Sequence, residues 1–289
     1  MNYFKDWAYL PNLFIRAKEL IMIIDAHVHI GNSFWGNFTP EFLLGIIGDK
    51  VCVCSNLAAI DAYTGKDEYV ANKEMLDASA KYPQIKPLYV CEVDRSLDTN
   101  IIRQMLKDYP QFVGLKFHPE FTKLTATSEK YDKYLEVARQ FRKPCLYHSG
   151  HIKSRFSSPA LIYQKAKQFP DVPIILGHLS TGPRSSHEEA AKIIVESIEQ
   201  DTATLYVDVS WVDVEDVIML IEALKNTSKG DYTHRIMWAS DAPVGDHNLK
   251  KEFYDSNLNV FKTRILEYFN DEELLNNLLY SNAQKLFNL

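Results

Sequence analysis

The chain has 289 residues, of which 46% are hydrophobic and 24% charged, and its formal net charge at pH 7 is −6. This composition predicts a globular protein with a large core, and the negative charge argues against a general nucleic-acid-binding surface. No segment reaches the roughly 18 consecutive apolar residues of a membrane span, and the N-terminus has no apolar run typical of a signal peptide. The four cysteines form no Cys-x-x-Cys pair, so we expect reduced core residues and a cytoplasmic location.

Residues 1–19 are aromatic and amphipathic, and we expect a short extension packed on the outside of a domain formed by residues 20–289. From residue 20 onwards, strand-like and helix-like segments alternate. The first strand, 20–30, is apolar and rich in β-branched residues, which is typical of a strand buried on both faces of a parallel sheet. Seven more strands are predicted at 50–55, 86–93, 112–118, 143–148, 172–178, 204–210 and 235–241.

Several of the intervening segments carry signals for the start of a helix. Thr39-Pro40 and Ser158-Pro159 each combine a capping side chain with proline at the first helical position. Ser186-x-x-Glu189 has the spacing of a capping box, and residues 250–289 hold two more helical patterns. Eight strands alternating with helices predict a single (β/α)8 TIM barrel of the α/β class, with a short N-terminal extension and C-terminal helices. An open doubly wound sheet is the alternative.

Active sites of such barrels lie at the carboxyl ends of the strands, and polar side chains gather there in this sequence. The first strand ends in His27 and His29, whose i, i+2 spacing directs both imidazoles to one face. A metal ion would satisfy two buried imidazoles, and ordinary hydrogen bonds in the core are the alternative. Later strands end in Lys116, His118, His148, His178 and Asp241.

Taken together, these strand ends resemble the amidohydrolase superfamily. The motifs are Asp25-Ala-His27-Val-His29, Gly-Leu-Lys116-Phe-His118-Pro, Tyr-His148-Ser-Gly, Leu-Gly-His178-Leu-Ser and Trp-Ala-Ser-Asp241-Ala-Pro. The similarity covers about residues 22–289 and is closest to the branch that contains aminocarboxymuconate-semialdehyde decarboxylase and many metal-dependent hydrolases.

The resemblance implies a divalent metal ion, usually Zn²⁺, held by His27, His29 and Asp241. In mononuclear members of the superfamily, His148 would complete the ligand set and His178 would hold the water. In binuclear members, His148 and His178 would bind a second ion, and Lys116, carboxylated to a carbamate, would bridge the two. We favour one ion over two.

The expected catalytic residues are Asp241, as the general base, and His178. The leading hypothesis is a metal-dependent hydrolase in which a metal-activated water attacks an amide, ester or lactone carbon of a small organic substrate. A nonoxidative decarboxylase of a carboxylated aromatic or enoic acid is the runner-up, followed by a TatD-like deoxyribonuclease. A homodimer is the default oligomer.

Five residues are candidates for substrate binding. Lys116 and His118 share one face of their strand, and His151 and Arg155 follow the fifth strand, where they can bind a substrate anion. Trp35 follows the first motif and can form an apolar wall of the pocket. For each of them, an ordinary structural or solvated role is the alternative.

Overall fold

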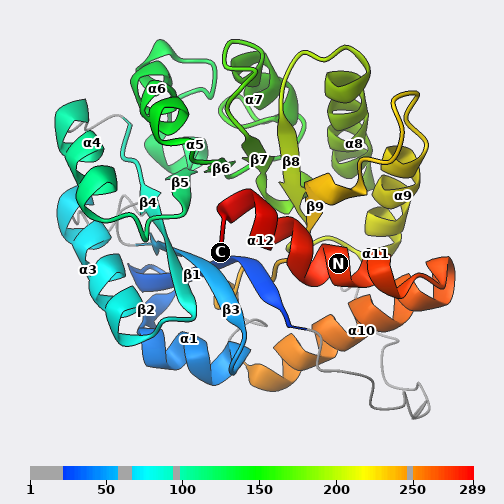
Figure 1. The fold of residues 1–289 in the computed structure, drawn as a ribbon, viewed down its shortest axis with the longest axis horizontal. Helices are drawn as coiled ribbons and strands as arrows, with labels where there is room; N and C mark the ends of the chain where they lie inside the picture. Colours follow the sequence, from blue (N-terminus) through cyan, green and yellow to red (C-terminus); the bar gives the residue numbers. More distant parts are fainter. Residues whose placement is uncertain (1–21, 58–66, 94–97, 246–249) are drawn as a thin grey trace.

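The computed structural model describes residues 22–57, 67–93, 98–245 and 250–289. The predicted extension, 1–19, lies outside these residues. The strands form one nine-stranded sheet that curls on itself, with helices arranged around its outside (Figure 1). The strands are β1 (Ile24–Ser33), β2 (Gly36–Phe38), β3 (Val51–Asn56), β4 (Ile85–Val90), β5 (Gly114–Phe117), β6 (Cys145–Tyr147), β7 (Ile174–Leu176), β8 (Leu205–Asp208) and β9 (Ile236–Met237).

The order in the sheet is β2-β1-β3-β4-β5-β6-β7-β8-β9. Every pair of neighbours is parallel except β2, which pairs antiparallel with β1. The eight predicted strands are therefore present in the predicted order, and β2 was not predicted. The α/β class and the mostly parallel sheet agree with the sequence.

Helices follow most of the parallel strands. They are α1 (Pro40–Ile47), α3 (Glu68–Lys81), α4 (Thr99–Asp108), α5 (Pro119–Thr122), α6 (Asp132–Phe141), α7 (Pro159–Ala166), α8 (Arg184–Glu199), α9 (Val214–Lys225), α10 (Lys251–Phe269), α11 (Glu272–Asn276) and α12 (Asn282–Phe287). Thr39 caps α1 as predicted, because its side chain accepts a hydrogen bond from the Phe42 amide. The predicted capping box was wrong: α8 begins at Arg184, directly after an extended Pro183, so Ser186 lies inside the helix.

The chain after β9 returns to β1. The Ala26 amide donates to the Trp238 carbonyl over 3.2 Å, the Asp241 amide to the His27 carbonyl over 2.8 Å, and the His29 amide to the Ala242 carbonyl over 2.8 Å. These bonds place the continuation of the last parallel strand beside the first. They also fix Asp241 next to the two histidines of β1.

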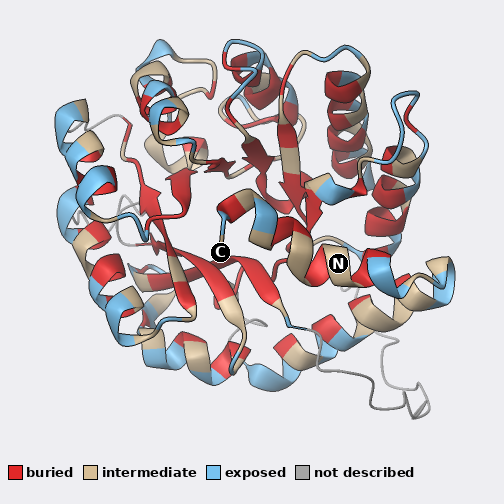
Figure 2. Ribbon diagram, in the orientation of Figure 1, coloured by how far each residue is buried: buried red, intermediate tan, exposed pale blue. Residues whose placement is uncertain are grey.

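The strands are almost entirely buried, whereas the helices are buried on one side only (Figure 2). Large apolar side chains pack between the sheet and the helices, and a second apolar cluster fills the inside of the curl. Ala283 and Phe287 of α12 belong to this inner cluster and contact side chains of the strands, and in Figure 1 α12 lies across the middle of the curl. The interior at this end is therefore closed by apolar packing, and the buried polar side chains collect at the carboxyl ends of the strands.

Candidate active site

An irregularity in β1 directs the two histidines of this strand. The register of β1 against β3 shifts between Asp25 and Val28, which is the signature of a β-bulge. Before the shift, Ile24 packs in the inner cluster, and after it Val28 packs toward the helices. The residues that alternate with Val28 are His27 and His29, which consequently face the interior.

Polar side chains from four other strands meet these histidines. Lys116 lies on β5, His148 follows β6, Asp208 ends β8 and Asp241 follows β9. Leu146 and Met237, which are two and four positions earlier on their strands, belong to the apolar inner cluster. Because side chains alternate along a strand, the polar residues also point inward, in a layer closer to the carboxyl ends of the strands.

Three of these side chains present metal-binding atoms to one point. His29 Nε2 lies 2.9 Å and His27 Nε2 lies 3.5 Å from Asp241 Oδ1, and the three residues form a candidate ligand group in the described chain. All three side chains are buried. Two imidazoles and a carboxylate are a donor set typical of catalytic zinc and similar divalent ions, so these residues fit the metal that the sequence implies.

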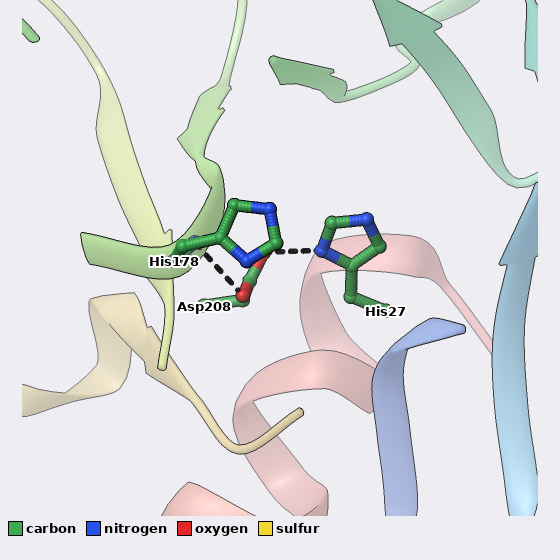
Figure 3. Close-up of side chains that lie close together, drawn as sticks. All are labelled: His27, His178 and Asp208. Atoms are coloured by element: carbon green, nitrogen blue, oxygen red, sulfur yellow. Dashed lines mark hydrogen bonds and ion pairs between the residues drawn. The ribbon is translucent and has the colours of Figure 1, made fainter. Parts of the chain in front are cut away.

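Asp208 orients His27 and His178 and was missed by the sequence analysis (Figure 3). Its Oδ2 accepts a hydrogen bond from His27 Nδ1 over 3.1 Å, and its Oδ1 accepts from the amides of His178 and Ser210, each over 3.1 Å. Although His27, His178 and Asp208 form a second group able to hold a metal, these donors already occupy both oxygens of Asp208. A carboxylate behind a ligating histidine fixes its tautomer and ring orientation, and this is the role that the geometry gives Asp208.

The same carboxylate determines the direction of a chain of hydrogen bonds. The Ser210 hydroxyl donates to Asp208, so it accepts from His178 Nδ1, which lies 2.8 Å away. This leaves His178 Nε2 as the nitrogen that faces the site, 3.2 Å from His148 Nδ1.

Burial and neighbouring charges set the protonation states of the site. Burial, together with the charge of Lys116, lowers the pKa of His27 to about 3, so the imidazole is neutral. Burial also lowers the pKa of Lys116 to about 8, and the Lys116 Nζ lies 2.7 Å from His27 Nε2. Burial raises the pKa of Asp241, but the neighbouring histidines outweigh it and hold that pKa well below its usual range. An ionised carboxylate beside neutral imidazoles is the state that metal binding requires.

An aromatic wall joins Trp35 to these histidines. The His118 ring stacks on the His148 ring at a centroid distance of 4.1 Å, and Phe121 lies 4.2 Å from His118. Trp35 packs edge to face on Phe121 at 6.2 Å. Of the predicted substrate-binding residues, Lys116 and His118 thus contact the cluster directly, and Trp35 reaches it through Phe121.

The two loop candidates lie apart from the cluster. His151 Nδ1 accepts a hydrogen bond from the Lys153 amide, and the exposed Arg155 guanidinium lies 4.7 Å from the Phe156 ring. Among the described residues, no hydrogen bond or ring contact joins either side chain to the histidine cluster, although the His151 ring lies against Gly182 at the pocket. The sequence showed that these residues lie in loops and can carry charge, but it did not show where their side chains point.

A pocket of about 350 Å³ opens beside the cluster. Its lining residues are His148, His178, Ser180, Thr181, Gly182, His187, Trp211 and Asp241. The backbone here is strained: His178, Leu179, Ser180, Trp211 and Asp241 all have φ between 45° and 71°. The other non-glycine residues with positive φ follow the ends of helices, where this conformation is common. Strain concentrated around one pocket is typical of a functional site.

Residues 62–289 match the family model for amidohydrolases. The chain belongs to the amidohydrolase family. The resemblance seen in the strand-end motifs is thus confirmed, and the family indicates a metal-dependent enzyme for which the described chain has candidate ligand groups. A comparison with curated proteins gives no match.

Solved structures with a similar fold include enzymes of different reactions. A probable 2-pyrone-4,6-dicarboxylic acid hydrolase from Acinetobacter baumannii has a TM-score of 0.64 at 15% identity, over 92% of this chain and 99% of that one. Dihydroorotase from Campylobacter jejuni has a TM-score of 0.58 at 20% identity, over 93% and 83%. A 5-carboxyvanillate decarboxylase from Novosphingobium aromaticivorans, solved with manganese, has 0.57 at 11%, over 93% and 96%. At these identities the similarity shows the fold alone.

The four cysteines are buried and form no disulfide. Among the described helices, none is both long and apolar enough to cross a membrane.

Proposed function

We propose that this amidohydrolase is a metal-dependent hydrolase that cleaves an amide, ester or lactone bond of a small organic substrate. The observation that carries the proposal is the convergence of His27 Nε2, His29 Nε2 and Asp241 Oδ1 beside a pocket of small-molecule size. We propose one Zn²⁺ ion, held by these residues and by His148. When bound, such an ion supplies Lewis acidity and makes water more acidic near neutral pH.

The protein's own side chains provide the proton transfers. Asp241 is ionised, and its Oδ2 is the oxygen turned away from His29, so it can accept a proton from the attacking water. His178 Nε2 can accept a hydrogen bond from that water, or take up the water's proton and then pass it to the leaving group. The aromatic wall of His118, Phe121 and Trp35 would exclude solvent from one side.

A nonoxidative decarboxylase is the second candidate. The observation that favours it is Lys116, a fully buried amine 2.7 Å from His27 Nε2, because an ammonium group can bind the carboxylate that such a substrate loses. A deoxyribonuclease is less favoured, because the net charge of −6 provides no general attraction to a phosphate backbone.

Several broader expectations belong to the same proposal. We propose that residues 20–289 form one domain and that its sheet closes as a (β/α)8 barrel, which the hydrogen bonds between β1 and the segment after β9 support. We also propose that the protein is cytoplasmic, that it forms a homodimer, and that it acts on a small-molecule substrate.

The test combines metal analysis with a panel of esters, lactones, amides and carboxylated aromatic acids. We expect about one equivalent of zinc, and we expect His27→Ala and Asp241→Asn to lower kcat/KM by more than about tenfold, or ~1.4 kcal/mol, with the fold retained. His234→Ala, at an exposed histidine outside the pocket lining, is the control. Release of CO₂ instead of hydrolysis would select the second candidate. Retention of more than about a tenth of the activity would reject the assignment of that residue.

A further inference from the structure

A second polar cluster borders the same pocket, where helices α8 and α9 meet. His187 Nδ1 lies 2.6 Å from Asp216 Oδ2, and Arg184 Nη1 lies 3.2 Å from Asp216 Oδ1. His187 and Asp216 are each 5% exposed. Burying such a pair between two helices carries a desolvation penalty that apolar side chains would avoid. The pair therefore points to a role beyond helix packing.

Asp216 determines which nitrogen of His187 is available. Its carboxylate accepts the Nδ1–H, so the neutral ring presents Nε2 as a hydrogen-bond acceptor. His187 lines the pocket, and its Nε2 has no partner among the residues that the structure describes. This nitrogen is also not sealed from solvent, in contrast to His118 Nδ1, which is buried without a partner. The pocket thus offers an accessible acceptor that the proposed reaction does not use.

The charges around His187 argue against an anion in this part of the pocket. Arg184 Nε donates to Glu188 Oε1 over 3.2 Å, so the carboxylates of Glu188 and Asp216 share one guanidinium. With His187 neutral, one positive and two negative charges leave one negative charge in excess. Asp241, which lines the same pocket, is a further ionised carboxylate. An acceptor nitrogen in these surroundings is complementary to a hydrogen-bond donor.

An uncharged donor fits the pocket better than an ammonium group. A buried cation needs a partner of opposite charge, but the two oxygens of Asp216 already face His187 and Arg184, and Asp241 belongs to the proposed metal site. The Thr181 hydroxyl lines the pocket as well, and it can donate to or accept from an uncharged polar group. A hydroxyl group can use both kinds of partner, since it donates one hydrogen bond and accepts others.

We propose that His187 Nε2 accepts a hydrogen bond from a hydroxyl group of the substrate, and that Asp216 is the positioning residue that directs this nitrogen into the pocket as an acceptor. The substrate is then a hydroxylated small molecule whose hydroxyl is separate from the bond that reacts near His27, His29 and Asp241. The inference rests on the proposed function for that reaction, but binding of the hydroxyl can be measured without turnover.

The experiment compares 3- and 4-hydroxybenzoate with 3- and 4-fluorobenzoate by isothermal titration calorimetry at about pH 8, which favours neutral imidazoles. Fluorine is close in size to a hydroxyl group but donates no hydrogen bond, so each pair isolates the donor. His187→Asn keeps an amide N–H for Asp216 and removes the Nε2 acceptor, whereas His187→Gln brings an amide oxygen near the position of Nε2. His234→Asn is the control, because it makes the same change at an exposed histidine outside the pocket lining. Each protein is titrated both zinc-loaded and metal-free.

We expect the wild-type protein to bind at least one hydroxybenzoate about tenfold more tightly than the fluorobenzoate of the same ring position. This preference should disappear in His187→Asn, return in part in His187→Gln and persist in His234→Asn, with the zinc content unchanged throughout. It should weaken in Asp216→Asn, because a carboxamide can also donate to Nδ1 and so leave the proton on Nε2. The affinity for the fluorobenzoates should stay constant in that variant, which separates positioning of the ring from a general loss of structure.

Equal affinities within both pairs in the wild-type protein, or a preference that survives in His187→Asn, would overturn the inference. Tighter binding of 3-(aminomethyl)benzoate than of either hydroxybenzoate would assign an ammonium group to this part of the pocket and overturn the hydroxyl. A preference that depends on His187 in a protein without hydrolytic activity would support the binding site and reject the proposed reaction. Hydrolysis without the preference would reject the binding site alone.

Discussion

Asp25 and Asp208 are both fully buried carboxylates beside His27, yet the protein holds them in opposite states. Burial raises the pKa of Asp25 to about 7, although hydrogen bonds from Ser240 and the His27 amide oppose the shift. Burial acts on Asp208 as well, but His27, whose ring donates to it, outweighs burial together with His178 and the Ser210 hydroxyl and holds the pKa well below its usual range.

The difference lies in the partners. Asp25 accepts from the amide and hydroxyl of Ser240 over 3.0 Å and 2.6 Å, and these neutral donors tie β1 to the segment after β9. Asp208 accepts from the ring of His27 and also from the amides of His178 and Ser210 and the Ser210 hydroxyl. This larger set of donors keeps the buried carboxylate ionised at neutral pH. The comparison therefore assigns Asp25 to the fold and Asp208 to the site.

The largest expected effect concerns Asp25 and stability. Its pKa of about 7 in the folded protein lies above the ordinary aspartate value of 3.8, so ionisation favours the unfolded chain as pH rises from about 4 to 7. Over this window the free energy of unfolding should fall by about 4 kcal/mol from this group, and no further above it. Asp25→Asn should remove the fall. Urea unfolding of both metal-free proteins from pH 4 to 8 measures it, and parallel pH curves would contradict the assignment.

Glu68 extends the comparison to a carboxylate outside the site. It is the first residue of α3, and its Oε2 accepts from the Glu92 amide over 2.8 Å. Burial raises its pKa from the ordinary glutamate value of 4.5 to about 7. Glu68→Gln should therefore remove a loss of about 3 kcal/mol between pH 4.5 and 7. The same unfolding series tests this, and zinc affinity should stay at the wild-type value.

Asp208→Asn tests the other side of the comparison. The carboxamide keeps the shape but loses the charge behind His27, so zinc affinity should fall by about 10- to 100-fold, as for other carboxylates that support a ligating histidine. Competition with a chromophoric chelator gives the affinity. Asp25→Asn is the matched control, because it makes the same change in a buried carboxylate that accepts no hydrogen bond from an imidazole ring. If both variants lose zinc equally, Asp208 has no special role.

The sequence predicted the eight parallel strands because each is a short apolar run bounded by polar or turn residues. It did not predict β2, since Gly36–Phe38 is too short to show a strand pattern. The start of α8 was misplaced because Ser186-x-x-Glu189 has the spacing of a capping box, although the helix already begins at Arg184, directly after the extended Pro183. Local patterns thus locate the elements, and the exact ends depend on backbone geometry.

The site was harder to predict than the fold. The i, i+2 spacing of His27 and His29 indicated that both rings face the same way, and the structure brings them to Asp241. Asp208 was overlooked because Val-Asp-Val-Ser resembles an ordinary strand end, although its position at the end of a predicted strand was a usable signal. His187 gave no such signal, because it meets Asp216 only when two helices pack together.

The smallest effect is expected at Trp211, which contacts Asp241. Like Asp208, Asp241 is an ionised carboxylate. The half-exposed indole Nε1 donates to Asp241 Oδ2 over 2.8 Å. Trp211→Phe keeps an aromatic wall but removes this donor, so Asp241 is less firmly oriented for proton transfer. We expect kcat/KM on an active member of the substrate panel to fall by about tenfold. This is the low end of the range for a hydrogen bond to a charged group, because the indole ring is half exposed. Trp35→Phe, which removes an indole N–H from the other side of the site, should change it less. Equal activities of the two variants would mean that Asp241 is held by His29 and its own strained backbone alone.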